Sequence, residues 1–111
     1  MSRKVNKTGK STENNWLSET RKKYLKESKA AIPGLEKILG NISREVQFSP
    51  QGSVVGVSIR YRTEQKARLE PQIINALEKA GGIKHKEHEG YTIKINDQDV
   101  LVTFGAVNRN P

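Results

Sequence analysis

The sequence predicts an α+β fold, in which N-terminal helices are followed by a β-hairpin, a third helix and a second β-hairpin. Two patterns predict this class. In residues 16–42 and 64–80, apolar residues recur every three or four positions, as on one face of an α-helix. In residues 54–62 and 91–104 they alternate with polar residues, as in a strand that buries one face. With 111 residues, the chain has room for one domain of ordinary size.

Proline and glycine separate the predicted helices. A helical pattern begins at Trp16, with an apolar stripe that starts at Leu17, and indicates a first helix that ends at Pro33. The helix should end there because the residue before a proline is displaced from the α region. Pro33 also suits the first position of the next helix. That helix has the clearest helical spacing in the chain, formed by Leu35, Ile38, Leu39 and Ile42. A third helix is predicted for residues 64–80, followed by the typical stop signal Gly81-Gly82.

The strands are expected at 44–48 and 54–62, and in a second pair within 91–104 that turns near Asn96. By alternation, Tyr61 and Tyr91 fall on the apolar faces and should point toward the core. The outer face then carries Ser58, Arg60, Arg62, Thr92 and Lys94.

A weak internal repeat relates the two hairpins. Leu35-Glu36-Lys37 precedes the first pair of strands, and Leu77-Glu78-Lys79 precedes the second. Duplication of an α-β-β unit would explain the match. The alternative is chance, because any amphipathic helix can contain Leu-Glu-Lys. A duplication implies a four-stranded antiparallel sheet with the helices on one face, which is the sheet we predict.

The chain is expected to consist of a flexible basic N-terminal arm, residues 1–15, and a single compact domain, residues 16–111. The arm is rich in Ser, Thr, Asn and Lys, and too poor in apolar residues to order its own backbone. Only 33% of all residues are hydrophobic, so the core must be small. Association with a second copy or with an assembly partner is therefore one candidate source of stability.

Composition excludes several classes of protein. The chain has no cysteine, which rules out disulfides, cysteine-bound zinc and thiol nucleophiles. No apolar run approaches the roughly 18 residues of a membrane span, and the basic start is not followed by the apolar segment of a secretory signal. We therefore predict a cytoplasmic protein with no membrane partner and no cofactor.

The net charge of +8 and an isoelectric point near 9.9 favour a polyanionic partner, above all nucleic acid. The charge is uneven: residues 1–30 contain nine Lys and Arg against three Glu, a net charge of +6. The remaining residues contain eleven positive and nine negative side chains. The candidate phosphate-binding residues are Arg3, Lys4, Lys7, Lys10, Arg21, Lys22, Lys23, Lys26, Lys29, Arg60 and Arg62.

These observations favour a non-catalytic protein that binds RNA or DNA, or assembles nucleoprotein, and grips phosphates with its arm and first helix. Because the tyrosines are expected inside, the sheet offers no surface on which bases could stack. Contacts to phosphate alone give salt-sensitive binding with little sequence preference.

Two alternatives from other classes remain open. A small toxin-like enzyme could cleave RNA without a metal. The residue types that this chemistry needs are supplied by His85 or His88, Glu87 or Glu89, and Arg60 or Arg62. A protein–protein assembly module is the other. No metal site is predicted, because His85 and His88 fall on opposite faces of a strand. The alternating charges around them are typical of a solvated edge strand.

Overall fold

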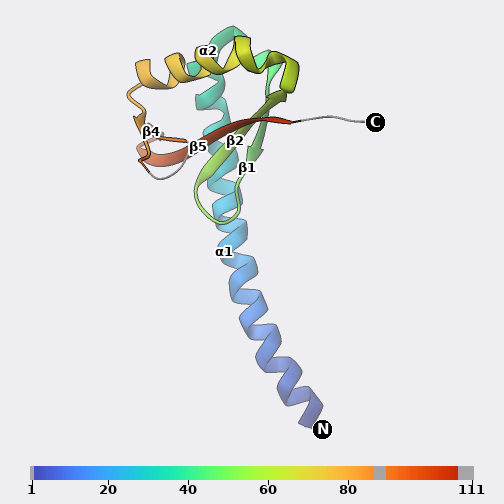
Figure 1. Ribbon diagram of the computed structural model, residues 1–111. Coiled ribbons are helices and arrows are strands. Elements are labelled where there is room, and N and C mark those ends of the chain that lie inside the picture. The colour runs from blue at the N-terminus through green and yellow to red at the C-terminus, as the bar shows by residue number, and fades with distance from the viewer. Residues whose placement is uncertain (1, 87–89, 108–111) are drawn as a thin grey trace.

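The computed structural model describes residues 2–86 and 90–107, with side chains from Ser18 onward (Figure 1). Within these residues, two α-helices, α1 (Ser2–Leu39) and α2 (Lys66–Lys79), accompany a five-stranded sheet. The strands are β1 (Gln47–Pro50), β2 (Gly56–Arg62), β3 (Ile83–Lys84), β4 (Tyr91–Ile95) and β5 (Gln98–Val107). Short 3-10 helices, η1 (Gly40–Glu45) and η2 (Thr63–Gln65), follow α1 and β2. The predicted α+β class is confirmed.

The sheet is mixed, which corrects the predicted four-stranded antiparallel sheet. Among the described strands the order is β1-β2-β5-β4-β3, with β2 and β5 parallel and all other neighbours antiparallel. The parallel pair arises because the chain leaves β2 through α2 and enters the second hairpin at β4. The return strand β5 then lies between β4 and β2. The predicted duplicated unit is not matched. The second half of the chain adds the extra strand β3, and its last strand, β5, lies parallel to β2, between β2 and β4.

The helix α1 continues through Pro33, so the predicted break at this residue is wrong. Proline deprives the carbonyl of Lys29 of its helical donor. Both residues are exposed, so water can replace that donor. The backbone of α1 includes the predicted arm from Ser2 onward, while the flexibility of that arm stays a prediction. Neither α1 nor the other described helix has an apolar stretch long enough to cross a membrane.

Both helices pack on one face of the sheet. Leu35 of α1 and Leu69, Ile73 and Leu77 of α2 are fully buried there. The buried sheet residues that meet them are Val57, Ile59, Tyr61, Tyr91, Ile93, Ile95, Val100 and Val102. In β2 and β4 these residues alternate with more exposed ones. The inward orientation predicted for both tyrosines is therefore confirmed. Neither of the two described α-helices lies on the opposite face of the sheet.

Ser28 joins α1 to the loop between β1 and β2. Its side chain is fully buried, and its Oγ accepts a hydrogen bond from the N–H of Gly56 at 2.9 Å. The same hydroxyl donates toward the carbonyls of Gln51 (3.0 Å) and Val54 (3.3 Å), which share its single proton. Further along α1, a Cβ atom on Gly34 would lie only 2.6 Å from Cγ2 of Ile95, so glycine is needed for this approach to β4.

Two tyrosine–glutamate hydrogen bonds anchor α2 on the sheet. Tyr61 on β2 donates to Glu70 at 2.5 Å, and Tyr91 on β4 donates to Glu78 at 3.0 Å. Burial, followed by the hydrogen bond to Glu78, raises the pKa of Tyr91, so this phenol keeps the proton that it donates. The two glutamates lie about two turns apart on α2, so the bonds fix how the helix crosses the sheet.

Replacing Ser28 with alanine tests the contact between α1 and the loop. The substitution leaves the buried N–H of Gly56 without its acceptor, which should lower the free energy of unfolding by about 1–3 kcal/mol. Urea unfolding followed by circular dichroism measures this change. Ser18→Ala, at an exposed position of the same helix, is the matched control and should leave stability nearly unchanged. Equal stability of the two variants would contradict the importance of the buried hydroxyl.

Candidate nucleic-acid interface

Three lysines form a separate face on α1. Lys22, Lys26 and Lys29 are exposed and, at 100° per residue, fall within about 60° of one another around the helix. They lie roughly 110–170° from the buried stripe centred on Ser28 and Leu35, so they point away from the sheet. We call these three residues the lysine face. The ion pairs recorded among the described side chains do not involve them.

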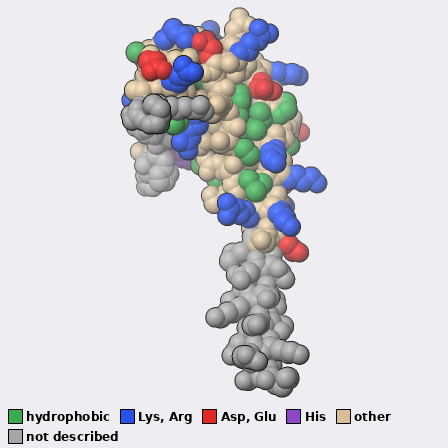
Figure 2. Space-filling view, turned by 90° about the vertical axis from the view of Figure 1, so that its right-hand side faces the viewer, with side chains coloured by type: hydrophobic (Ala, Val, Ile, Leu, Met, Phe, Trp, Pro, Cys, Tyr) green, Lys and Arg blue, Asp and Glu red, His purple; other side chains and the backbone are tan. Residues whose placement is uncertain are grey.

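Arg21 and Lys23 lie on the same part of α1, and both are exposed. Arg21 falls on the side of the helix that faces the sheet, roughly 30° from the buried stripe. A Cβ atom on Gly52 would lie 2.9 Å from Cγ and 3.0 Å from Nε of Arg21. Arg21 therefore packs its stem on the β1–β2 loop while its charge stays in water. Figure 2 shows Lys and Arg side chains gathered where α1 leaves the body of the protein. The other predicted cations of α1 have side chains outside the described set: Arg3, Lys4, Lys7 and Lys10.

A second cationic surface lies at one end of the sheet. Here η1, β1, β2, η2 and the end of β5 surround a depression of about 580 Å³ that we call the arginine groove. Three exposed arginines line it: Arg44, Arg60 and Arg62. The side chains of Gln47 and Gln65 also line it, so hydrogen-bond donors accompany the positive charges.

The positive charge of the arginine groove is only slightly reduced by neighbouring carboxylates. Among the described lining residues, Glu45 is the one acid, and Arg68 already binds it with two hydrogen bonds of 2.5 and 3.2 Å. Arg62 and Glu64 are 3.9 Å apart and largely exposed, which makes their attraction weak. In the described part of the chain, Arg44 and Arg60 have no ion-pair partner.

The open face of the sheet beyond the groove has a fixed polar floor. The side-chain amide of Gln51 donates to Ser58 (3.1 Å) and Thr103 (3.4 Å), whose hydroxyls are themselves 2.9 Å apart. Gly105 is paired with Arg60 in the register of β2 and β5, and a Cβ atom on it would have no neighbour within 4 Å. The backbone beside Arg60 is therefore open to an approaching ligand.

The structure does not bring all the predicted cations together. Arg60 and Arg62 extend from the open face of the sheet, whereas Lys22, Lys26 and Lys29 extend from the far side of α1. Sequence reasoning missed Arg44, which was placed in a predicted strand at residues 44–48. It lies instead in η1, and the register that pairs Gln47 with Arg60 brings η1 to the arginines of β2. Strand alternation could not reveal a contact that depends on this register.

The residues proposed for RNA cleavage are only partly described. His85 is half-buried, and its Nε2 lies 2.6 Å from Oγ1 of Thr92. It follows β3, three strands away from Arg60, a separation of roughly 14 Å across the sheet. The predicted partners at positions 87–89 lie outside the described residues. Within the described ranges, no three His, Asp or Glu side chains form a cluster that could hold a metal ion.

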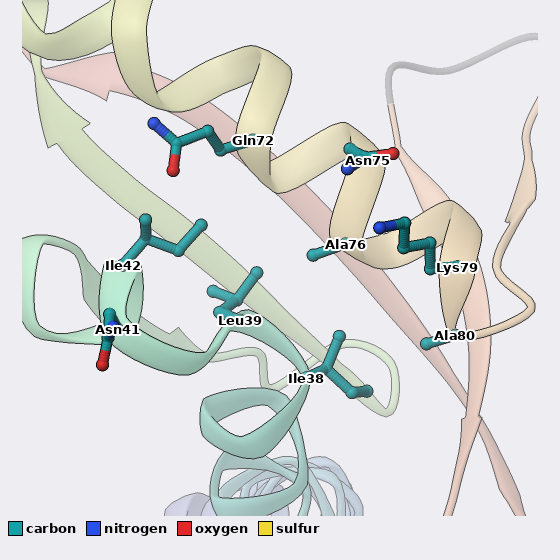
Figure 3. A pocket seen from close by; sticks show the side chains of 9 residues that line it. All are labelled: Ile38, Leu39, Asn41, Ile42, Gln72, Asn75, Ala76, Lys79 and Ala80. Atoms are coloured by element: carbon teal, nitrogen blue, oxygen red, sulfur yellow. The ribbon is translucent and has the colours of Figure 1, made fainter.

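A different cavity, of about 520 Å³, separates the end of α1 and η1 from α2 (Figure 3). Ile38, Leu39 and Ile42 face α2 across it, and Ala76 lines the opposite side. Lys79 is the one titratable group among its lining residues, so the cavity lacks an acid–base pair for catalysis. Its apolar floor suits a packing contact better than a reaction.

Comparisons of this chain with protein-family models, with curated proteins and with solved structures found no match. The two cationic surfaces are therefore the features of the described residues that bear most directly on function.

The hydrogen bond between Arg68 and Glu45 predicts a pH effect on stability. It holds the pKa of Glu45 below its usual range and raises the pKa of Arg68, so both groups are charged at neutral pH. A carboxylate with a lowered pKa stabilises the fold above its ordinary pKa, and this contribution disappears as the pH falls through the lowered value. Between neutral pH and about pH 3, wild type should lose more stability than Glu45→Gln.

Urea unfolding at a series of pH values measures this difference. The difference should be small, since the two side chains are 53% and 37% exposed. Glu36→Gln, at an exposed carboxylate outside this contact, is the control and should follow wild type. If Glu45→Gln showed the same pH dependence as wild type, the ion pair would not be coupled to folding.

Proposed function

We propose that this protein is a non-catalytic nucleic-acid-binding protein, or a component of nucleoprotein assembly, that contacts the phosphate backbone. The observation that carries the proposal is the lysine face, in which three exposed lysines on one side of α1 point away from the sheet. Lysine ammonium groups at helical spacing can each contact a phosphate without any requirement on the base. Lys23 lies beside this surface, and the arm residues Arg3, Lys4, Lys7 and Lys10 would add positive charge along α1.

The arginine groove at the end of the sheet supports the same proposal. Arginine binds phosphate through two parallel N–H groups, and Arg44 and Arg60 have no described carboxylate competing for them. The aromatic residues Tyr61 and Tyr91, each 4% exposed, cannot stack on bases. Binding should therefore be sensitive to salt and largely insensitive to sequence.

Substitutions test the lysine face better than truncation does. Removing residues 1–30 would delete the cations of this part of α1, but it would also remove the buried Ser28. We therefore expect Lys22→Ala, Lys26→Ala and Lys29→Ala, combined in the full chain, to weaken binding to a labelled DNA duplex. The slope of log K against log salt should become shallower by roughly 2.7, because each neutralised phosphate contributes about 0.9 to it. Fluorescence anisotropy between about 50 and 200 mM salt measures it.

A matched variant controls for the loss of charge alone. The control removes three exposed lysines outside both cationic surfaces, by Lys66→Ala, Lys79→Ala and Lys84→Ala. This variant should keep most of the wild-type slope of log K against log salt. The same titration with single-stranded RNA shows which nucleic acid is preferred. If wild type bound neither RNA nor DNA even at low salt, the proposed function would be wrong.

The absence of catalysis is a separate prediction. Transfer RNA incubated with the protein should remain intact on a denaturing gel, because His85 is bonded to Thr92 and lies three strands from Arg60. Cleavage that disappears in the His85→Ala variant would replace this proposal with the ribonuclease alternative. Asn75→Ala, at an exposed position of α2, serves as the control for purity and handling.

A further inference from the structure

The lysine face lies on the far side of α1, whereas the arginine groove lies at one end of the sheet and takes Arg60 and Arg62 from the face opposite α1. α1 covers the face of the sheet that carries the core, and Figure 1 shows it running behind the strands. Lys26, in the middle of the lysine face, is roughly 170° from the buried stripe of α1 and points away from the sheet. Arg60 and Arg62 extend from the opposite face of β2, since Ile59 and Tyr61 point into the core between and beside them. The sheet and α1 therefore separate the two cationic surfaces.

From this arrangement we infer that one molecule bridges two separate nucleic-acid duplexes, one on each surface. The inference rests on the proposed function and goes beyond it, because binding alone requires only one surface. Each surface supplies three exposed cations, and the single described carboxylate that lines the arginine groove, Glu45, is occupied by Arg68. The two surfaces are thus comparable in charge, and neither depends on the other for its geometry.

A single short duplex cannot occupy both surfaces. Double-stranded DNA is stiff over about 150 base pairs, so a duplex of about 20 base pairs remains nearly straight. A straight rod that lies along the lysine face is kept from the arginine groove by the sheet and by α1. Backbone contacts on each side do not select a sequence, so two unrelated duplexes can be held at once.

Co-capture of two duplexes tests the inference. One DNA duplex of about 20 base pairs is attached to beads, and a second of unrelated sequence carries a fluorophore. Wild-type protein at low salt should retain the fluorescent duplex on the beads. A large excess of protein should release it again, because each duplex then has its own protein molecule.

Two triple variants locate the bridge. Lys22→Ala, Lys26→Ala, Lys29→Ala and, separately, Arg44→Ala, Arg60→Ala, Arg62→Ala should each reduce co-capture to the level without protein. All six positions are exposed, so both variants should fold, and circular dichroism checks this. Each variant should still bind a single duplex by anisotropy, at a concentration chosen to saturate its remaining surface. The Lys66, Lys79 and Lys84 triple variant should co-capture as wild type does.

The possible outcomes separate this inference from the proposed function. If wild type bound no duplex by anisotropy, the proposed function would fail first. If wild type bound duplex without co-capture, or if either triple variant bridged normally, only the bridging inference would be overturned. A mixture of the two triple variants should not restore co-capture. Restoration would show that a dimer, and not the two surfaces of one chain, connects the duplexes.

Discussion

The buried hydroxyl of Ser28 holds one long helix against one loop, and through this contact it sets the direction in which the cations of α1 point. A serine can serve both carbonyls and an N–H within a core because its oxygen accepts and donates at once. Alanine or valine at this position would leave the loop without partners for its backbone. Gly34 adds a steric requirement on the same helix, since α1 there approaches Ile95 too closely for a Cβ atom. The hydroxyl of Ser28 and the absence of a side chain at Gly34 thus hold α1 in the orientation that points the lysine face away from the sheet.

The second half of the chain is organised by α2. Its glutamates bind a tyrosine on β2 and a tyrosine on β4, which lie on either side of β5 in the sheet. The helix therefore spans the place where the last strand is inserted, and it connects the parts of the sheet that the two hairpins supply. In the described part of the chain no helix covers the open face, which leaves Ser58 and Thr103 half-buried and the arginines of β2 exposed.

Local pattern was sufficient for the features that depend on alternation and helical spacing. The orientation of Tyr61 and Arg60 followed from the period of a strand, and the lysine face followed from the period of a helix. The helix break predicted at Pro33 was wrong. An exposed proline in a packed helix removes only one backbone hydrogen bond, and water can replace it, so α1 continues. The parallel pairing of β2 with β5 and the position of Arg44 were not predictable, since each depends on contacts between segments far apart in the chain.

The central position of β5 has a consequence for how the protein is made. The ribosome releases a chain from its N-terminus, so β1, β2 and β4 emerge before the strand that joins them. Contacts between β2 and β5, such as that of Ser58 with Thr103, bridge 45 residues of sequence. Pairings over such separations form slowly compared with a local hairpin. Until residues 98–107 have emerged, the inner edges of β2 and β4 lack the strand that pairs with both of them, and unpaired strand edges are the sites at which chains associate.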